Sequence, residues 1–116
     1  LIATNTTVTR PETLTSRYKV ETGGLSGAPL MDLSTSTLRA LYRATEGLIP
    51  IVGVGGITSG GDAYDKIRSG ASLVQVYSAM VYRGPYIAVQ IAQEIGELLS
   101  QDGFSNISEA IGIDAR

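Results

Sequence analysis

The residues best suited to chemistry are glycines that follow a short apolar run. The segment Gly53–Gly61 comes after Ile51-Val52 and leads into an amphipathic stretch. Glycines let the backbone approach a ligand, and consecutive N–H groups before a helix form a site for an anion. The pattern predicts phosphate binding, with a tight strand–helix turn as the alternative. It is not a Rossmann fingerprint, because Thr58 holds the third glycine position, and it lacks the Gly-Lys-Ser/Thr ending of a P-loop.

Two further segments point to the same ligand. The first is the cluster Gly23–Gly27, which by itself would favour a flexible loop tip. The second is Tyr77-Ser78, a pair of hydroxyl side chains at the end of an apolar run. In a parallel barrel the carboxyl ends of successive strands lie on one face, where late loops commonly bind a phosphate group. We therefore expect these segments and the Gly53–Gly61 run to converge on one site.

Uncharged polar residues end the first apolar run. The segment Thr4–Thr7 offers donors and acceptors suited to orienting a polar, planar substrate, although a local Asx or Thr turn is the alternative. No residue of the chain is a convincing general base. Because histidine and cysteine are absent, disulfides, thiolate–metal sites and pairings of histidine with serine or cysteine are excluded. We expect no catalytic residue and no metal site in this chain.

The composition is that of an ordinary globular protein. The chain has 116 residues, of which 43% are hydrophobic and 17% charged, with a net charge of −2. The basic residues are scattered, so nothing indicates nucleic-acid binding. No apolar run approaches the roughly 18 residues needed to cross a bilayer. The segment Leu1–Asn5 has neither an initiator methionine nor a basic region, and is not expected to be a signal or transit peptide.

Strands and helices are expected to alternate, which predicts βαβ units and a parallel sheet with right-handed crossovers. A (β/α)₈ barrel spends roughly 30 residues on each unit, so the chain holds three to four units and cannot close a barrel. Opening inside a strand indicates a fragment whose missing units would cover the sheet edge. The expected strands are 1–3, 51–54 and 73–77; the expected helices are one capped by Ser34 or Thr35, 60–68, one from Pro85 to Gly103, and a last turn at 108–111.

Apolar spacing predicts which faces are packed. The two strands 51–54 and 73–77 are expected to be buried on both faces. Helical stripes recur at three- and four-residue spacing, and glycines suit the positive φ that follows a helix. The stripe residues are Leu38, Leu41, Tyr42, Thr45, Ala63, Ile67, Ile87, Ile91, Ile95 and Leu98, and the ending glycines are Gly47, Gly70 and Gly103.

Three ordered motifs resemble the class 2, quinone-dependent dihydroorotate dehydrogenases, over essentially the whole chain. The first joins Thr4–Thr7 and Arg10-Pro11 to the run Glu21–Gly27. The second is Ile51–Ile57 with Ala63 and Gly70-Ala71, and the third is Ala71–Ser78 followed by Gly84-Pro85. The resemblance implies that residues 1–116 are the C-terminal part of a single FMN-binding TIM-barrel domain, incomplete on its N-terminal side.

That family oxidises dihydroorotate to orotate in pyrimidine biosynthesis, passing a hydride to FMN and electrons to ubiquinone. The resemblance implies that Asn5 and Thr6 bind orotate and that Leu25 packs near the flavin. It implies FMN contacts from Ser26, Gly27, Val54, Gly55, Gly56, Tyr77 and Ser78, and a quinone entrance lined by Tyr77, Met80, Val81 and Pro85.

The family's serine base, a flavin-contacting lysine and the helices of the quinone tunnel are expected upstream of this chain. The same resemblance implies a location on the mitochondrial inner membrane, with the bacterial cytoplasmic membrane as the alternative. Two other functions stay open: another FMN- or phosphate-binding barrel enzyme, such as a 2-hydroxyacid oxidase or an inosine-phosphate dehydrogenase, and a non-catalytic phosphate-binding scaffold. The enzyme alternatives would require a histidine or cysteine at the reacting face.

Overall fold

A computed structural model describes all residues, 1–116. Its centre is a parallel sheet with the strand order β1-β2-β3, so each strand lies beside its neighbour in sequence. Helices connect successive strands, as parallel pairing requires. This arrangement confirms the predicted α/β class. The strands are β1 (Ile2–Ala3), β2 (Val52–Val54) and β3 (Leu73–Gln75).

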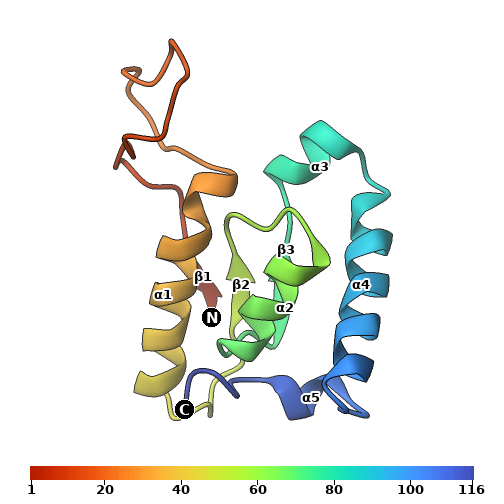
Figure 1. Ribbon diagram of the computed structural model, residues 1–116. Helices are drawn as coiled ribbons and strands as arrows, with labels where there is room; N and C mark the ends of the chain where they lie inside the picture. Colours follow the sequence, from red (N-terminus) through yellow and green to blue (C-terminus); the bar gives the residue numbers. More distant parts are fainter.

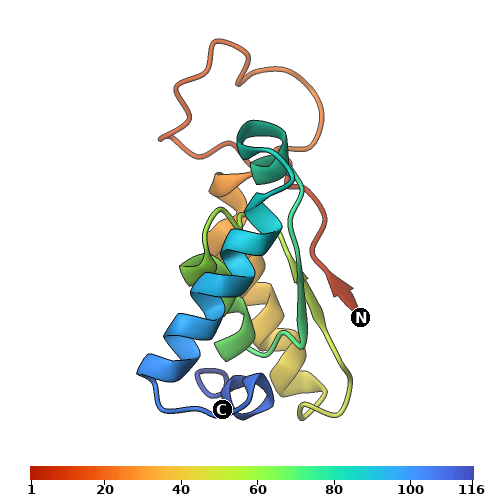
Figure 2. The same cartoon turned by 90° about the vertical axis from the view of Figure 1, so that its right-hand side faces the viewer.

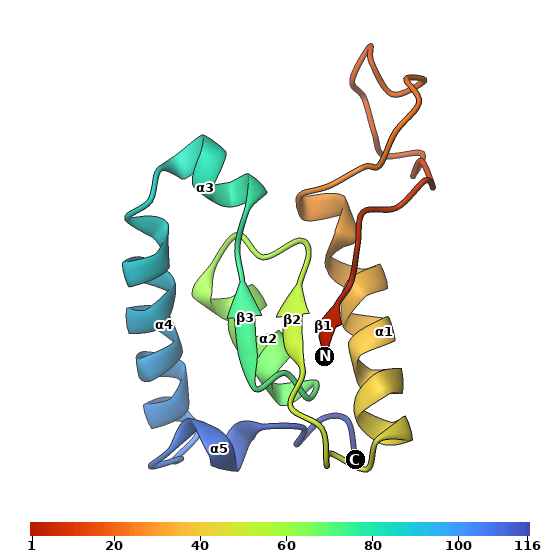
Figure 3. The same ribbon diagram turned by 180° about the vertical axis from the view of Figure 1, so that it is seen from behind.

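The helices cover one face of this sheet. In Figure 1, α1 and α4 stand on either side of α2, and Figure 3 shows the opposite face of the sheet without a helix in front of it. Seen from the side, the loop after β1 extends past the end of the sheet (Figure 2). The helical segments are η1 (Ala28–Leu30), α1 (Met31–Ala44), α2 (Gly60–Arg68), α3 (Ser78–Arg83), α4 (Ile87–Gln101) and α5 (Ile107–Ala110).

The core lies between the sheet and the helices. Leu38 of α1 and Ala63 and Ile67 of α2 are buried, and the isoleucine stripe of α4 packs against them. This confirms the predicted packed faces. Leu41, Tyr42 and Leu98 complete the stripes as partly buried neighbours of the core.

The two faces of the sheet differ in burial. Ala3 and Gly53 point toward the helices and are buried, whereas Ile2 and Leu73 are 68% and 66% exposed on the other face. The prediction that strands 51–54 and 73–77 would be buried on both faces does not hold within residues 1–116, because Leu73 is exposed and Val52 and Val54 are only half-buried. Alternation of this kind is what barrel strands show, with every second residue directed to the barrel interior.

Three predicted boundaries differ from the structure. Helix α1 begins at Met31, so Ser34 and Thr35 lie inside the helix rather than at its N-cap. The Thr35 hydroxyl donates to the Met31 carbonyl instead, a common alternative for a hydroxyl inside a helix, and the Ser34 hydroxyl lies within hydrogen-bonding distance of the Met31 and Gly55 carbonyls. The strand expected to reach Tyr77 ends at Gln75, and the unpredicted α3 follows. This helix is too short for a periodic signal and buries only Ala79.

The remaining helix boundaries agree better. Helix α2 spans the predicted residues, and α4 begins two residues after Pro85, at Ile87. Gly47, Gly70 and Gly103 have φ values of +71°, +115° and +78°, so each adopts the conformation that favours glycine after a helix.

Candidate functional site

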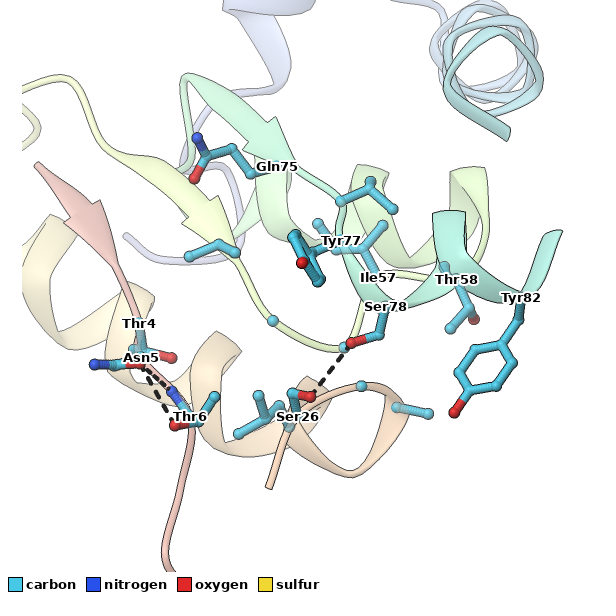
Figure 4. Close-up of a pocket in the computed structure, with 18 residues that line it drawn as sticks. Thr4, Asn5, Thr6, Ser26, Ile57, Thr58, Gln75, Tyr77, Ser78 and Tyr82 are labelled. Atoms are coloured by element: carbon cyan, nitrogen blue, oxygen red, sulfur yellow. Dashed lines mark hydrogen bonds between the residues drawn. The ribbon is translucent and has the colours of Figure 1, made fainter. Parts of the chain in front are cut away.

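A cavity of about 400 Å³ lies at the carboxyl ends of the three strands. Residues that follow β1, β2 and β3 line it, together with the residues around η1 (Figure 4). The structure thus brings together segments that are far apart in sequence. The cavity lining includes all nine residues predicted to bind substrate or cofactor: Asn5, Thr6, Ser26, Gly27, Val54, Gly55, Gly56, Tyr77 and Ser78.

The glycines after β2 carry unused backbone donors. Gly55 and Gly56 have φ values of +108° and +82°, and neither N–H group donates a hydrogen bond within the chain. A Cβ at Gly56 would lie 2.7 Å from the Cβ of Met31, at the start of α1. Glycine is therefore required here both for the backbone conformation and for close packing against α1. We call this pair the glycine nest.

The N-terminus of α2, by contrast, is already capped by protein groups. The Ser59 hydroxyl accepts the Asp62 N–H at 3.2 Å. The Asp62 carboxylate accepts the N–H and hydroxyl of Thr58 at 2.8 and 2.7 Å, and the Glu94 carboxylate accepts the Gly60 N–H at 2.5 Å. The predicted anion position at this helix end is therefore occupied by carboxylates. The N–H groups of the glycine nest, just before this helix end, have no acceptor in the chain.

Hydrogen bonding also determines the charge of Asp62. Burial alone would raise the pKa of this carboxyl group, but the hydrogen bonds from Thr58 and Ser59 outweigh that effect and hold the pKa below its usual value. Asp62 is thus a fixed negative charge at the end of α2.

The second glycine cluster meets the end of β3 at the cavity. The hydroxyls of Ser26 and Ser78 lie 3.4 Å apart, as the dashed line in Figure 4 shows. Gly27 has a φ of +86°, and a Cβ there would lie 3.6 Å from the Cβ of Ser78. For Ser26 and Gly27 the structure does not support the interpretation as a loop tip, because both residues line the cavity.

For Asn5 and Thr6 the sequence leaves two alternatives open, contact with a substrate and a local turn, and the geometry is compatible with both. The Asn5 side-chain oxygen accepts the Thr6 N–H at 2.7 Å, which is a local turn. The Asn5 side-chain amino group donates to no atom of the chain, and Asn5 is one of the residues that line the cavity. The Thr6 side chain occupies the space that a side chain on Gly24 would need. The local turn therefore orients Asn5 without using all of its hydrogen-bonding capacity.

The long loop between β1 and η1 is closed at its base. Thr7 and Leu25 exchange backbone hydrogen bonds of 3.1 and 2.7 Å. The Arg10 guanidinium donates to the carbonyls of Lys19, Glu21 and Gly23 at 3.0, 3.0 and 2.7 Å. Leu25 takes part in this closure and does not line the cavity, and its expected place near the flavin stays a prediction.

The cavity lining carries no charged side chain. Of the predicted quinone-entrance residues, only Tyr77 lines the cavity, while Met80, Val81 and Pro85 lie outside it and are exposed. Gln75 is a lining residue without a predicted role, and its only sequence signal is one polar residue inside an apolar run. The other unassigned lining residues are Thr4, Ala28, Leu30, Ile57, Thr58, Val76, Ala79 and Tyr82.

Two negative findings complete the geometry. None of the helices has the length and apolarity that crossing a membrane requires. The chain holds no cluster of three or more acidic residues arranged to bind a metal ion.

Backbone donors left free on glycines at the carboxyl ends of parallel strands are an arrangement that phosphate-binding proteins of the α/β barrel class use. The family model described as dihydroorotate dehydrogenase matches residues 1–99, and the chain belongs to this family.

Individual relatives agree with this assignment. The chain is 56% identical over its whole length to a protein from Azorhizobium caulinodans named dihydroorotate dehydrogenase (quinone), and covers 33% of it. It is 53% identical to the Mus musculus protein named dihydroorotate dehydrogenase (quinone), mitochondrial, and covers 29% of it. The chain thus spans about a third of the length of the relatives it matches.

A solved structure confirms the predicted fold class. The crystal structure of ligand-free DHODH from Eimeria tenella matches with a TM-score of 0.95 and 50% sequence identity. The match covers 99% of this chain and 32% of that chain. The three β/α units are therefore part of a (β/α)₈ barrel.

Proposed function

We propose that residues 1–116 form the FMN-phosphate and orotate side of a quinone-dependent dihydroorotate dehydrogenase. They would be the C-terminal part of a single FMN-binding barrel domain. The complete enzyme would oxidise dihydroorotate to orotate in de novo pyrimidine biosynthesis, with ubiquinone as the electron acceptor. The observation that carries the proposal is the convergence of uncharged donors from three strand ends on one cavity.

The residues fit an FMN phosphate. The free N–H groups of Gly55 and Gly56 and the hydroxyls of Ser26 and Ser78 are donors suited to phosphate oxygens. Val54 and Gly27 add an apolar surface and room beside them, and Tyr77 stands at the rim. When bound, FMN supplies the hydride acceptor that the protein side chains cannot provide.

Asn5 and Thr6 are proposed to orient orotate. The free amino group of Asn5 and the hydroxyl of Thr6 match the carbonyl and carboxylate oxygens of a pyrimidine acid. We expect the proton acceptor for dihydroorotate in the remainder of the barrel, because the lining holds no carboxylate, histidine or lysine side chain. This chain then contributes binding and orientation, and no catalytic residue.

The exposed apolar residues of α3 are proposed to form one wall of the quinone entrance. Met80 and Val81 lie on α3, Pro85 follows it, and Tyr77 precedes it, so the four residues lie at one end of the molecule. The membrane is proposed to be the mitochondrial inner membrane or, for a bacterial protein, the cytoplasmic membrane. Relatives named as quinone enzymes from mitochondria and bacteria support this location.

The test is a visible spectrum of the full-length protein before and after addition of dihydroorotate. We expect flavin bands that bleach within the enzyme's turnover time. Bands that persist with dihydroorotate but bleach with a 2-hydroxy acid would favour the oxidase alternative, and absence of flavin would favour the scaffold alternative.

Asn5→Ala sharpens the same test. Losing one hydrogen bond to a charged ligand removes about 1.5–3 kcal/mol, so flavin reduction by dihydroorotate should require at least about tenfold more substrate. Asn106→Ala makes the same chemical change at α5, at the other end of the molecule (Figure 1), and should leave flavin reduction unchanged. Equal kinetics for the two variants would contradict the role of Asn5.

A further inference from the structure

We propose that Lys66 is a positioning residue for the phosphate of FMN, acting through Ser34 on the glycine nest. This inference rests on the proposed FMN function and adds a residue that does not line the cavity. Lys66 lies on α2, Ser34 on α1, and the nest follows β2, so the arrangement joins three elements that pack together.

The Lys66 side chain is fully enclosed. It is 0% exposed, and its ammonium group donates to the Ser34 hydroxyl, to the Thr35 hydroxyl at 2.7 Å and to the Met31 carbonyl at 3.4 Å. These three acceptors match the three donors of an ammonium group. Lysine is almost never fully buried without such partners, and here none of the partners is a carboxylate. Because no carboxylate hydrogen-bonds this buried ammonium group, its positive charge is available to stabilise an anionic ligand bound nearby.

The hydrogen bonds have a defined direction. An ammonium group can only donate, so the Ser34 oxygen accepts from Lys66 and its own proton is left for a carbonyl. The Gly55 carbonyl oxygen lies 2.9 Å from the Ser34 oxygen and is closer than the Met31 carbonyl oxygen at 3.2 Å. Because Lys66 and Thr35 already donate to the Met31 carbonyl, the Ser34 proton is left for the Gly55 carbonyl.

This bond orients the donor that faces the ligand. The Gly55–Gly56 peptide is trans, and in a trans peptide the C=O and N–H bonds point in opposite directions. Holding the Gly55 carbonyl toward α1 therefore turns the Gly56 N–H away from α1, and this N–H has no acceptor in the chain. Ser34 is the only group of the chain that donates to the Gly55 carbonyl, so without it no hydrogen bond fixes the orientation of this peptide.

Charge points to the same role. The lining of the cavity is uncharged, and the carboxylates of Asp62 and Glu94 stand at the end of α2. A phosphate dianion bound beside them needs a compensating cation, and Lys66 is linked to the nest by two hydrogen bonds. Asp62 and Asp65 of α2 and Asp32 and Arg39 of α1 also act on Lys66. Burial nevertheless lowers the pKa of Lys66 to about 8.

The experiment compares FMN with riboflavin, which has the same ring and ribityl chain but no phosphate. Flavin-free full-length protein is titrated with each compound, and the ratio of the two Kd values is measured for the wild type, Lys66→Met and Ser34→Ala. Lys19→Met is the matched control, because Lys19 is the exposed lysine of the loop.

We expect the wild type to bind FMN more tightly than riboflavin. Lys66→Met should reduce that preference by about tenfold or more, the loss expected for a charge-assisted interaction, with riboflavin affinity unchanged. Ser34→Ala should reduce it in the same direction, and Lys19→Met should not change it. Between pH 7 and 9 the wild-type preference should fall as Lys66 loses its proton, whereas the preference of Lys66→Met should not follow this titration.

Other outcomes overturn the inference. If Lys66→Met and Ser34→Ala weaken both flavins equally, or neither, Lys66 only joins α1 to α2. If Lys66→Met does not fold, Ser34→Ala and the wild-type pH profile decide. A wild-type protein that binds no flavin, or binds both equally, would instead overturn the proposed FMN site itself.

Discussion

At the scale of single residues, the glycine nest shows why a residue without a side chain is needed. Gly56 combines a positive φ with close contact to Met31, so two independent constraints exclude any Cβ at this position. Gly61, five residues further along, meets neither constraint, because a Cβ there would lie 3.6 Å from the Ser59 hydroxyl, an ordinary contact.

Gly56→Ala in the full-length protein should therefore reduce FMN occupancy. The added methyl group must displace the start of α1 or rotate the nest, and either change misplaces the two N–H donors. The measurement is the ratio of visible flavin absorbance to protein absorbance after purification. Gly61→Ala is the control and should keep the wild-type ratio. Equal ratios for both variants would contradict the nest as the phosphate site.

Lys66 makes a second prediction, on stability. Its pKa falls from 10.5, the usual value for an exposed lysine, to about 8 in the fold, because burial disfavours the charged form. Between these two values the unfolded chain binds more protons than the folded one, so Lys66 makes the free energy of unfolding rise with pH from 8 toward 10.5. Below pH 8 both states are protonated and the contribution is constant.

The measurement is urea unfolding of flavin-free full-length protein at pH 7, 8 and 9.5. The difference in stability between wild type and Lys66→Met should change in favour of the wild type as the pH rises, and should be flat below pH 8. Tyr64 also titrates at high pH, since burial and its hydrogen bond to Asp102 raise its pKa, but it is present in both proteins. A difference that is independent of pH would contradict the burial of a charged Lys66.

At the scale of elements, Tyr42 joins the ends of two helices to the C-terminal turn. Its ring fills the space that side chains would need on Gly47 after α1, Gly70 after α2 and Gly112. Arg68 adds ion pairs to Asp102 and Asp114 at the same end of the molecule, at 2.5 and 2.7 Å. At this end of the molecule, opposite the cavity, side-chain packing and ion pairs therefore stabilise the contacts between the helices and the C-terminal turn.

Gly112→Ala should destabilise the protein without affecting flavin. The φ of Gly112 is +72°, and a Cβ would collide with the Tyr42 ring, so we expect a loss of about 1–3 kcal/mol in the free energy of unfolding. Gly96→Ala is the control, because nothing lies within 4 Å of a Cβ there and alanine favours the interior of α4 by about 0.5–1 kcal/mol. Thermal unfolding and flavin content of both variants make the comparison.

The exposed face of α3 makes a prediction about the electron acceptor. Val81 is 71% exposed, and a charge at this apolar surface should repel a quinone. Val81→Asp should raise the KM for a ubiquinone analogue by about tenfold or more, while flavin reduction by dihydroorotate stays at the wild-type rate. Val20→Asp, in the loop after β1, is the control. Slower flavin reduction in Val81→Asp, or no change in either half-reaction, would contradict the quinone entrance.

At the scale of the whole molecule, the sheet has two open edges and an uncovered apolar face. β1 and β3 each pair only with β2, and Ile2 and Leu73 are exposed on the face without helices. Unpaired edges and exposed apolar side chains favour association. We expect residues 1–116 expressed alone to self-associate in sedimentation velocity, and the variant Leu73→Asp to do so less.

The same substitution should act in the opposite sense in the full-length protein. There Leu73 would point into the barrel interior, and a buried unpaired carboxylate would lower stability and soluble yield. Two outcomes would contradict the barrel arrangement. One is that residues 1–116 expressed alone are monomeric, and the other is that Leu73→Asp leaves the stability of the full-length protein unchanged.

Much of the fold and site follows from local sequence. Helix α2 matches its predicted span because Ser59, the first-turn Asp62 and Gly70 act within one helix length. The predicted start of α1 is wrong because Ser34 and Thr35 are good N-cap residues, and nothing nearby in sequence shows that they are needed by Lys66. Helix α3 escapes prediction because a single buried residue gives no periodicity.

The sequence by itself determined the alternation of strands and helices, the three polar segments at strand ends, and the family. Each depends on spacing within a few residues or on ordered motifs. Only the tertiary structure decided that the Glu94 carboxylate caps α2, that Ser26 meets Ser78, and that Lys66 is linked to the glycine nest through Ser34. The physical reason is that a buried polar group must find a partner wherever packing provides one, and these partners are 21 to 52 residues apart along the chain.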